Sequence, residues 1–144
     1  MKIKFTASLL PLSPLIRLFT WSKCSHCELE FSDGVIITAA MELGMVIATR
    51  RTHRWEYTYD IPVTVEQEKA IREWAESQLG VPYDYTALAP FNVLIPRKKK
   101  QWKDHKLWMC SEFCAYALEL AGMKLFPDNA KKIKPSDLYN KFKK

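Results

Sequence analysis

The chain has 144 residues, 48% of them hydrophobic and 26% charged, which is typical of one globular domain and excludes a disordered, collagenous or coiled-coil protein. It contains only four glycines and no glycine-rich phosphate-binding motif, which excludes the nucleotide-cofactor folds that depend on such a motif. The 22 basic residues outnumber the 16 acidic ones, so the chain attracts anionic partners. We expect a single domain over residues 1–144.

The first 21 residues begin with lysines and an apolar run, as a signal peptide does. Pro11, Pro14 and Arg17 interrupt that run, so we predict a short strand over residues 2–6 and a helix over 14–21 instead. No stretch reaches the roughly 18 uninterrupted apolar residues of a membrane span. A soluble, cytoplasmic protein is the default expectation, and the sequence does not determine the compartment.

A period of two begins at Ser25. Polar residues at 26, 28 and 30 alternate with apolar ones at 27, 29 and 31, a turn follows at 32–34, and residues 35–40 resemble a returning strand. This pattern predicts a β-hairpin. Residues 45–49 and 55–59 indicate two further strands, and the short connections favour an antiparallel sheet.

Helical patterns follow after residue 62. Thr64 with Gln67 forms a capping box, and the helix that it opens is expected to end at Gly80. Residues 81–84 are interpreted as a turn, 85–91 as a short helix, and 95–106 as a basic loop. A second strong helix is predicted from Cys110 to Gly122, and a last one opens at Pro135. The apolar stripes expected on the two strong helices are Val65, Ala70, Ile71, Trp74, Ala75 and Leu79, and Phe113, Tyr116, Ala117, Leu120 and Ala121.

Four cysteines occur as two spaced pairs that resemble halves of a zinc site. If residues 24–27 are extended, however, Cys24 and Cys27 point to opposite faces and cannot share one ion. Four cysteines in a chain of this length also make no disulfide-stapled domain. We therefore expect no metal and no cofactor, with Cys24, Cys27 and Cys114 as small core residues.

Cys110 differs because it lies at the predicted start of a helix. The backbone N–H groups and the helix dipole there lower the pKa of a thiol and can donate to an oxyanion. His26, on the polar side of its strand with Glu28 on the same face, is a candidate base. Simple packing of Cys110 and His26 is the alternative. His53 and His105 lie among basic residues in expected loops and are interpreted as exposed.

Three segments together resemble a known family: residues 25–31 around His26, Gly80-x-Pro82-Tyr83-Asp84, and residues 109–113 around Cys110. With the histidine strand before the cysteine helix, the order resembles the circularly permuted NlpC-type papain-like cysteine amidases and peptidases. The lecithin-retinol acyltransferase-like enzymes share that branch. The resemblance covers about residues 14–138. It implies an α+β, permuted papain-like fold in which an antiparallel sheet packs against a helix with the nucleophilic cysteine at its N-terminus.

The resemblance also implies roles for individual residues. Cys110 matches the nucleophile, His26 the general base, and Tyr83 the tyrosine that helps to line the site and the oxyanion hole. The residue that orients His26 is left open between two side chains. Thr38 lies across the hairpin, whereas Glu28 shares the face of the histidine strand, and that shared face favours Glu28.

Three functions are open at this point. The first is a cysteine hydrolase that cleaves an amide, in a cell-wall peptide or a related small molecule, through a thioester. The second is a lipid acyltransferase or thioesterase with the same dyad, for which the basic surface and the apolar residues 91–95 offer an anionic interface. The third is a non-catalytic binding module that uses the basic residues 97–100. That loop lacks interleaved aromatic residues, so no specific nucleic-acid partner is expected. The sequence indicates no oligomeric state.

Overall fold

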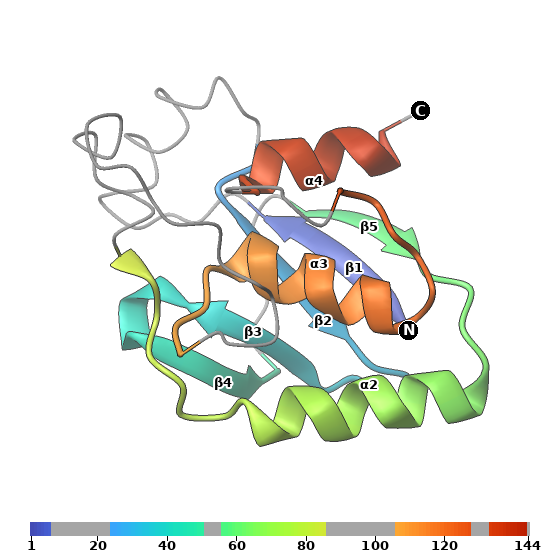
Figure 1. Ribbon diagram of the computed structural model, residues 1–144, viewed down its shortest axis with the longest axis horizontal. Coiled ribbons are helices and arrows are strands. Elements are labelled where there is room, and N and C mark those ends of the chain that lie inside the picture. The colour runs from blue at the N-terminus through green and yellow to red at the C-terminus, as the bar shows by residue number, and fades with distance from the viewer. Residues whose placement is uncertain (7–23, 51–55, 86–105, 128–132, 144) are drawn as a thin grey trace.

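The computed structural model describes residues 1–6, 24–50, 56–85, 106–127 and 133–143, shown in colour in Figure 1. Among these residues, no helix is long and apolar enough to cross a membrane. The strands are β1 (Lys2–Thr6), β2 (His26–Glu30), β3 (Ile36–Ala40), β4 (Met45–Thr49) and β5 (Glu56–Asp60). The helices are η1 (Met41–Leu43), α2 (Val65–Ser77), α3 (Cys110–Leu120) and α4 (Pro135–Phe142).

The five strands form one antiparallel sheet in the order β4-β3-β2-β1-β5. The predicted strand at 2–6 and the predicted hairpin over 26–40 are both confirmed. β5 does not extend the hairpin series but pairs with β1, which leaves the N-terminal strand inside the sheet. Phe5 of β1 therefore lies between Cys27 of β2 and Tyr57 of β5.

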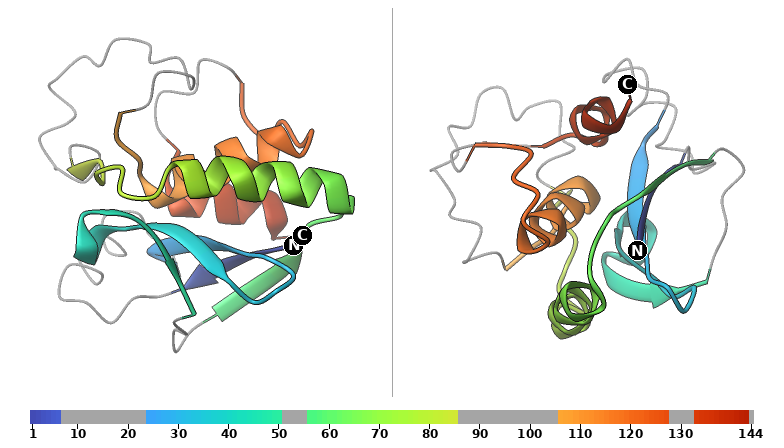
Figure 2. Two further views of the ribbon diagram at one scale, coloured as in Figure 1. Left: turned by 90° about the horizontal axis from the view of Figure 1, so that it is seen from below. Right: turned by 90° about the vertical axis from the view of Figure 1, so that its right-hand side faces the viewer.

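The helices cover one face of this sheet, as the two views of Figure 2 show. Phe5 marks that face because its ring packs against Tyr139 of α4, with the ring centroids 5.4 Å apart. Cys27 lies directly opposite Phe5 in the antiparallel register, so its side chain is on the same face. His26 and Glu28, the polar residues that alternate with Cys27 in this strand, are buried as well, so the side chains at these two positions do not face solvent.

α2 begins as predicted, with a capping box between Thr64 and Gln67. Its buried stripe is narrower than expected, because only Ile71 and Ala75 are buried. α2 lies at the margin of the helix layer in Figure 1, so few of its side chains face the interior. The helix also ends at Ser77, before the predicted Gly80. The predicted stripe is wrong at Val65, which is 80% exposed, at Leu79, which is 44% exposed, and at Ala70.

α3 is the central helix of the layer and contacts β2, β3, α2 and α4. The sequence predicted its start at Cys110, and the structure confirms it. Its first six residues, 110–115, are all buried, whereas a helix packed on one side only would bury a single stripe. Elements therefore surround this end of α3 on several sides. Leu120 was expected in the core but is 44% exposed, although Leu118 and Ala121 beside it in the last turn are buried.

Residues 81–84 do not form the predicted isolated turn. Pro82 makes a β-bridge with Met45, and Tyr83 makes one with Trp108. Backbone hydrogen bonds from Tyr83 to Gly44 and from Trp108 to Pro82 join this segment to the end of the β3–β4 connection and to the approach to α3. The predicted helix at 14–21, nearly all of the one at 85–91 and nearly all of the basic loop lie outside the described residues.

A candidate active site at the start of the central helix

Cys110 is the first residue of α3. The preceding residue, Met109, is extended and makes no side-chain cap, so no capping side chain occupies the N–H groups of the first turn. The hydroxyl of Ser111 donates to the carbonyl of Ile133 and holds this end of the helix against the segment before α4. The thiol of Cys110 therefore lies at the positive end of a helix dipole, in a buried position.

His26 is the first residue of β2, and its side chain hydrogen-bonds to the thiol of Cys110. The other contact of the ring defines its tautomer. The Thr38 Oγ1 atom donates its single proton to the Cys27 carbonyl at 2.9 Å and lies 3.1 Å from Nε2 of His26. Because that proton is already used, Thr38 accepts from Nε2–H. Nδ1 is then left as the basic nitrogen of His26.

Glu28 is the second group beside the imidazole. Its Oε2 lies 3.9 Å from Nε2 of His26, within ion-pair distance but beyond a hydrogen bond. The sequence predicted Glu28 as the residue that orients His26, because the two share one face of the strand. In the structure the Thr38 hydroxyl, and not Glu28, lies at hydrogen-bond distance from Nε2. Glu28 belongs to β2 and Thr38 to β3, which pair in the hairpin, so the two side chains border the ring from adjacent strands.

Tyr83 approaches Cys110 from residues 81–84, the segment that makes β-bridges to Met45 of β4 and to Trp108 just before α3. Its N–H donates to the Gly44 carbonyl at 2.8 Å, and the next N–H, of Asp84, donates to Trp108 at 2.9 Å. The Tyr83 hydroxyl hydrogen-bonds to Cys110. Burial raises the pKa of Tyr83 well above its usual value, and the negative charge of Cys110 raises it further. The phenol is thus held as a neutral donor beside the thiol.

Cys27 completes the surroundings of Cys110, and sequence reasoning missed this. Its thiol hydrogen-bonds to Cys110 and to Cys114, which are one helical turn apart in α3. The expectation that Cys24, Cys27 and Cys114 are buried is confirmed. The contact of Cys27 with Cys110 depends on how β2 packs under α3, for which the sequence carries no signal beyond the apolar period of the strand.

These contacts determine which thiol ionises. The hydrogen bond from Cys27 lowers the pKa of Cys110 most; burial opposes this, and the charge and hydrogen bond of His26 lower the pKa further. The net effect holds the pKa of Cys110 well below its usual value. Burial raises the pKa of Cys27 well above its usual value and also raises that of Cys114. The site therefore favours one thiolate, on Cys110, that accepts a hydrogen bond from a neutral Cys27.

The other sequence candidates are placed as follows. All four cysteines are free thiols. Among the described residues, no group of three or more His, Cys, Asp or Glu side chains is arranged to hold a metal ion. His53, His105 and the basic residues 97–100 lie outside the described residues. Glu112, in the first turn of α3, is buried and adds negative charge near Tyr83.

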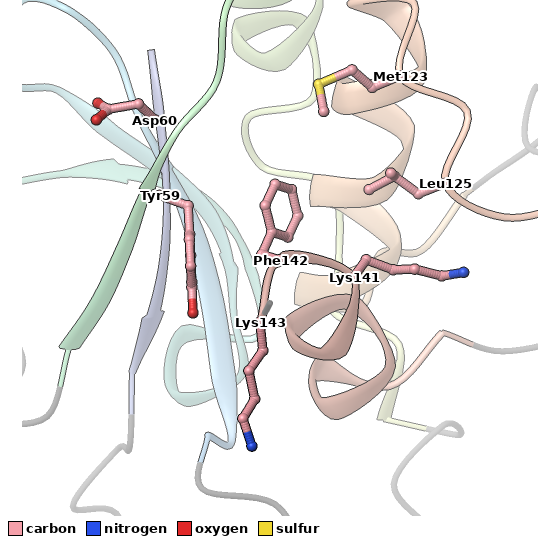
Figure 3. Close-up of a pocket in the computed structure, with 7 residues that line it drawn as sticks. All are labelled: Tyr59, Asp60, Met123, Leu125, Lys141, Phe142 and Lys143. Carbon is pink, nitrogen blue, oxygen red and sulfur yellow. The ribbon is translucent and has the colours of Figure 1, made fainter.

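A separate groove of about 560 Å³ lies between the edge strand β5 and α4 (Figure 3). None of the candidate site residues lines it. The Tyr59 and Phe142 rings, 5.5 Å apart, form part of its wall. The residues around this groove are Tyr59, Asp60, Met123, Leu125, Lys141, Phe142 and Lys143.

No protein-family model matches the chain, and no curated protein matches it. A similar solved structure is the metalloprotein YiiX of Escherichia coli O157:H7, of the family DUF1105. It superposes with a TM-score of 0.60 at 23% identity, over 86% of this chain and 67% of YiiX. The two chains share a fold. YiiX has an NlpC and lecithin-retinol acyltransferase-like fold, so the expected α+β architecture, with a helix that begins at Cys110 packed on an antiparallel sheet, is confirmed.

Proposed function

We propose that the protein is a cysteine hydrolase that cleaves an amide bond through a thioester intermediate. The observation that carries the proposal is the hydrogen-bonded series Cys110–His26–Thr38, with the cysteine at a helix N-terminus. A nucleophile in contact with a base, and a base held by a third group, are what nucleophilic catalysis of acyl transfer requires.

Each residue has a defined task in the proposed reaction. The Cys110 thiolate attacks the carbonyl carbon of the substrate, and the protonated His26 gives its proton to the departing amine as the C–N bond breaks. Water then attacks the thioester, with His26 as the base, and Cys110 leaves as the thiolate. Thr38 holds Nε2–H throughout, which keeps Nδ1 directed at the reacting atoms.

The negative oxygen that develops on the substrate needs hydrogen-bond donors. The backbone N–H groups at the start of α3 and the Tyr83 hydroxyl are the donors nearest to Cys110. Tyr83 contributes a proton and not a charge, since its raised pKa keeps the phenol neutral at physiological pH.

For the substrate we propose a peptide or small amide of the cell-wall type, as the resemblance to NlpC-type amidases implies. The acyltransferase alternative relied on residues 91–95, which lie outside the described residues, and no feature of the described site favours it. YiiX is called a metalloprotein. The described residues of this site do not fit that chemistry, because no three His, Cys, Asp or Glu side chains among them are arranged to hold a metal ion. No step of the proposed reaction uses a metal.

The test compares thiol reactivity with turnover. Iodoacetamide at neutral pH should label Cys110 much faster than Cys24 or Cys114, and His26→Ala should reduce that difference. Hydrolysis of a panel of cell-wall peptides and acyl amides should disappear in Cys110→Ala. Cys114→Ala, one turn further along the same helix, is the matched control and should retain turnover. Uniform slow labelling of the cysteines, or hydrolysis that survives in Cys110→Ala, would refute the proposal.

A further inference from the structure

Three thiols meet where β2 packs against the start of α3, which crosses over it in Figure 1. Cys27 hydrogen-bonds to both Cys110 and Cys114, and all three are buried and free. The proposed hydrolysis uses only Cys110 as a nucleophile. It leaves Cys27 as a second sulfur in direct contact with the first, with no covalent task of its own.

The three thiols differ in reactivity. Cys110 has a lowered pKa, whereas the pKa values of Cys27 and Cys114 are raised. Hydroperoxides oxidise thiolates and leave neutral buried thiols largely unreacted. Oxidation of this cluster therefore begins at Cys110. A hydroperoxide is also far smaller than a peptide, so it needs less displacement of side chains to reach a residue that is 1% exposed.

We propose that Cys27 is the resolving thiol of Cys110, so that the two residues form a site of reversible oxidative modification by hydroperoxides. The inference rests on the proposed function only in treating Cys110 as a thiolate at neutral pH.

The chemistry balances in two steps. In the first, the Cys110 sulfur attacks one peroxide oxygen and the O–O bond breaks. The other oxygen leaves as water or an alcohol, with a proton from the His26 imidazolium. The sulfur has then lost two electrons to the peroxide and is a sulfenic acid. In the second, the Cys27 sulfur attacks the Cys110 sulfur, the S–S bond forms, and the hydroxyl group leaves with the Cys27 proton as water.

Geometry selects Cys27 over Cys114 as the partner. Cys110 and Cys114 are four residues apart in one helix, a spacing that separates the Cβ atoms by about 5–6 Å. A disulfide needs a Cβ–Cβ separation of about 3.5–4.5 Å, so that pair could join only by distorting the first turn of α3. Cys27 reaches Cys110 from a different element and already hydrogen-bonds to it, so this pair can join without distorting the first turn of α3.

The experiment treats the reduced full-length protein with a small excess of hydrogen peroxide, blocks free thiols with N-ethylmaleimide, and maps the peptides by mass spectrometry. Wild type should yield a disulfide between the Cys27 and Cys110 peptides, and dithiothreitol should restore the Cys110 thiol. In Cys27→Ser that disulfide is absent, Cys110 proceeds to sulfinic acid, and the thiol recovered by dithiothreitol falls by several fold. Cys24→Ser, another buried cysteine, and Cys114→Ser should both behave as wild type.

Thermal unfolding shows whether Cys27→Ser is folded, and Cys27→Ala repeats the test with a second side chain. A Cys110–Cys114 disulfide, a disulfide between chains, or equal recovery in wild type and Cys27→Ser would overturn the inference. If the reduced protein hydrolyses amides but forms no Cys27–Cys110 disulfide, the inference alone fails. If the disulfide forms but no amide is cleaved, the proposed function alone fails.

Discussion

For single residues, the hydrogen bond between Cys27 and Cys110 explains why their pKa values shift in opposite directions. A thiol that donates to a neighbouring sulfur stabilises the neighbour as the thiolate and is itself harder to ionise. Burial alone would raise the pKa of both thiols. The hydrogen bond from Cys27 and the adjacent His26 reverse the effect of burial at Cys110 only.

We predict that Cys27→Ala raises the pKa of Cys110, because the thiolate loses the donor that lowers this pKa most. Cys27→Ser retains a hydroxyl donor and should raise the pKa less. The pH dependence of Cys110 alkylation by iodoacetamide measures both shifts, and its midpoint should move toward about 8.5, the value for a free thiol, in the alanine variant. Cys24→Ala is the control. A single midpoint shared by all four proteins would contradict this explanation.

A second prediction separates Thr38 from Glu28. Thr38→Val removes the acceptor of Nε2–H, so the imidazole loses its orientation and the rate of hydrolysis should fall by up to about 100-fold, the cost of a misplaced catalytic group. Thr38→Ser keeps the hydroxyl and should restore most of that rate. Glu28→Gln should change the rate less, since its Oε2 lies 3.9 Å from the ring and makes no hydrogen bond to it.

The pH profile of Cys110 alkylation gives an independent reading of the same pair. Removing the negative charge of Glu28 should lower the apparent pKa of His26, because a nearby carboxylate favours the imidazolium. Thr38→Val should move it less, since a hydroxyl carries no charge. If Glu28→Gln has the larger effect on the rate and Thr38→Val is silent, Glu28 and not Thr38 orients His26.

Among the elements, α2 shows which features of a helix can be predicted from neighbouring residues in the sequence. Thr64 accepts from the N–H of Gln67 at 3.2 Å, and the Gln67 side chain accepts from the N–H of Thr64 at 2.9 Å. These contacts involve residues three apart, so the sequence alone predicts them. The width of the buried stripe depends instead on where the helix lies in the layer, and that expectation was too broad.

The capping box provides a prediction about this element. Thr64→Ala should destabilise the protein by about 1 kcal/mol, the typical cost of losing a hydroxyl cap. Thermal unfolding should then shift downward by a few degrees. Thr64→Ser keeps the cap and should unfold close to wild type. The alkylation rate of Cys110 should be the same in all three proteins, because α2 supplies no group that contacts the thiol; a change in that rate would show that α2 positions the site.

At the scale of the whole molecule, packing between the sheet and the helix layer decides which apolar residues matter. Leu118 and Leu120 lie two residues apart in α3, yet Leu118 is fully buried and Leu120 is 44% exposed. Leu118→Ala should therefore cost about 2–5 kcal/mol, whereas Leu120→Ala should stay within about 1 kcal/mol of wild type. Urea unfolding measures both. Equal losses would mean that Leu120 is covered in solution.

Local patterns in the sequence predicted most of the elements and several candidate residues of the site. Hydrophobic periods of two and 3.6, turn residues and caps are local, so they predicted β1, the 26–40 hairpin and the starts of α2, α3 and α4. The same local signals drew attention to Cys110 at a helix start and to His26 on a strand. Tyr83 came from the resemblance of its motif.

How these parts meet depends on tertiary packing. The pairing of β1 with β5 places the N-terminal strand inside the sheet, and the bridges of Pro82 and Tyr83 bring that segment beside Cys110. The choice between Thr38 and Glu28 is a difference between 3.1 and 3.9 Å from one ring nitrogen. The contact of Cys27 with Cys110 joins residues that are far apart in the chain. Local patterns carry no such information, because these distances depend on how the sheet and the helices pack together.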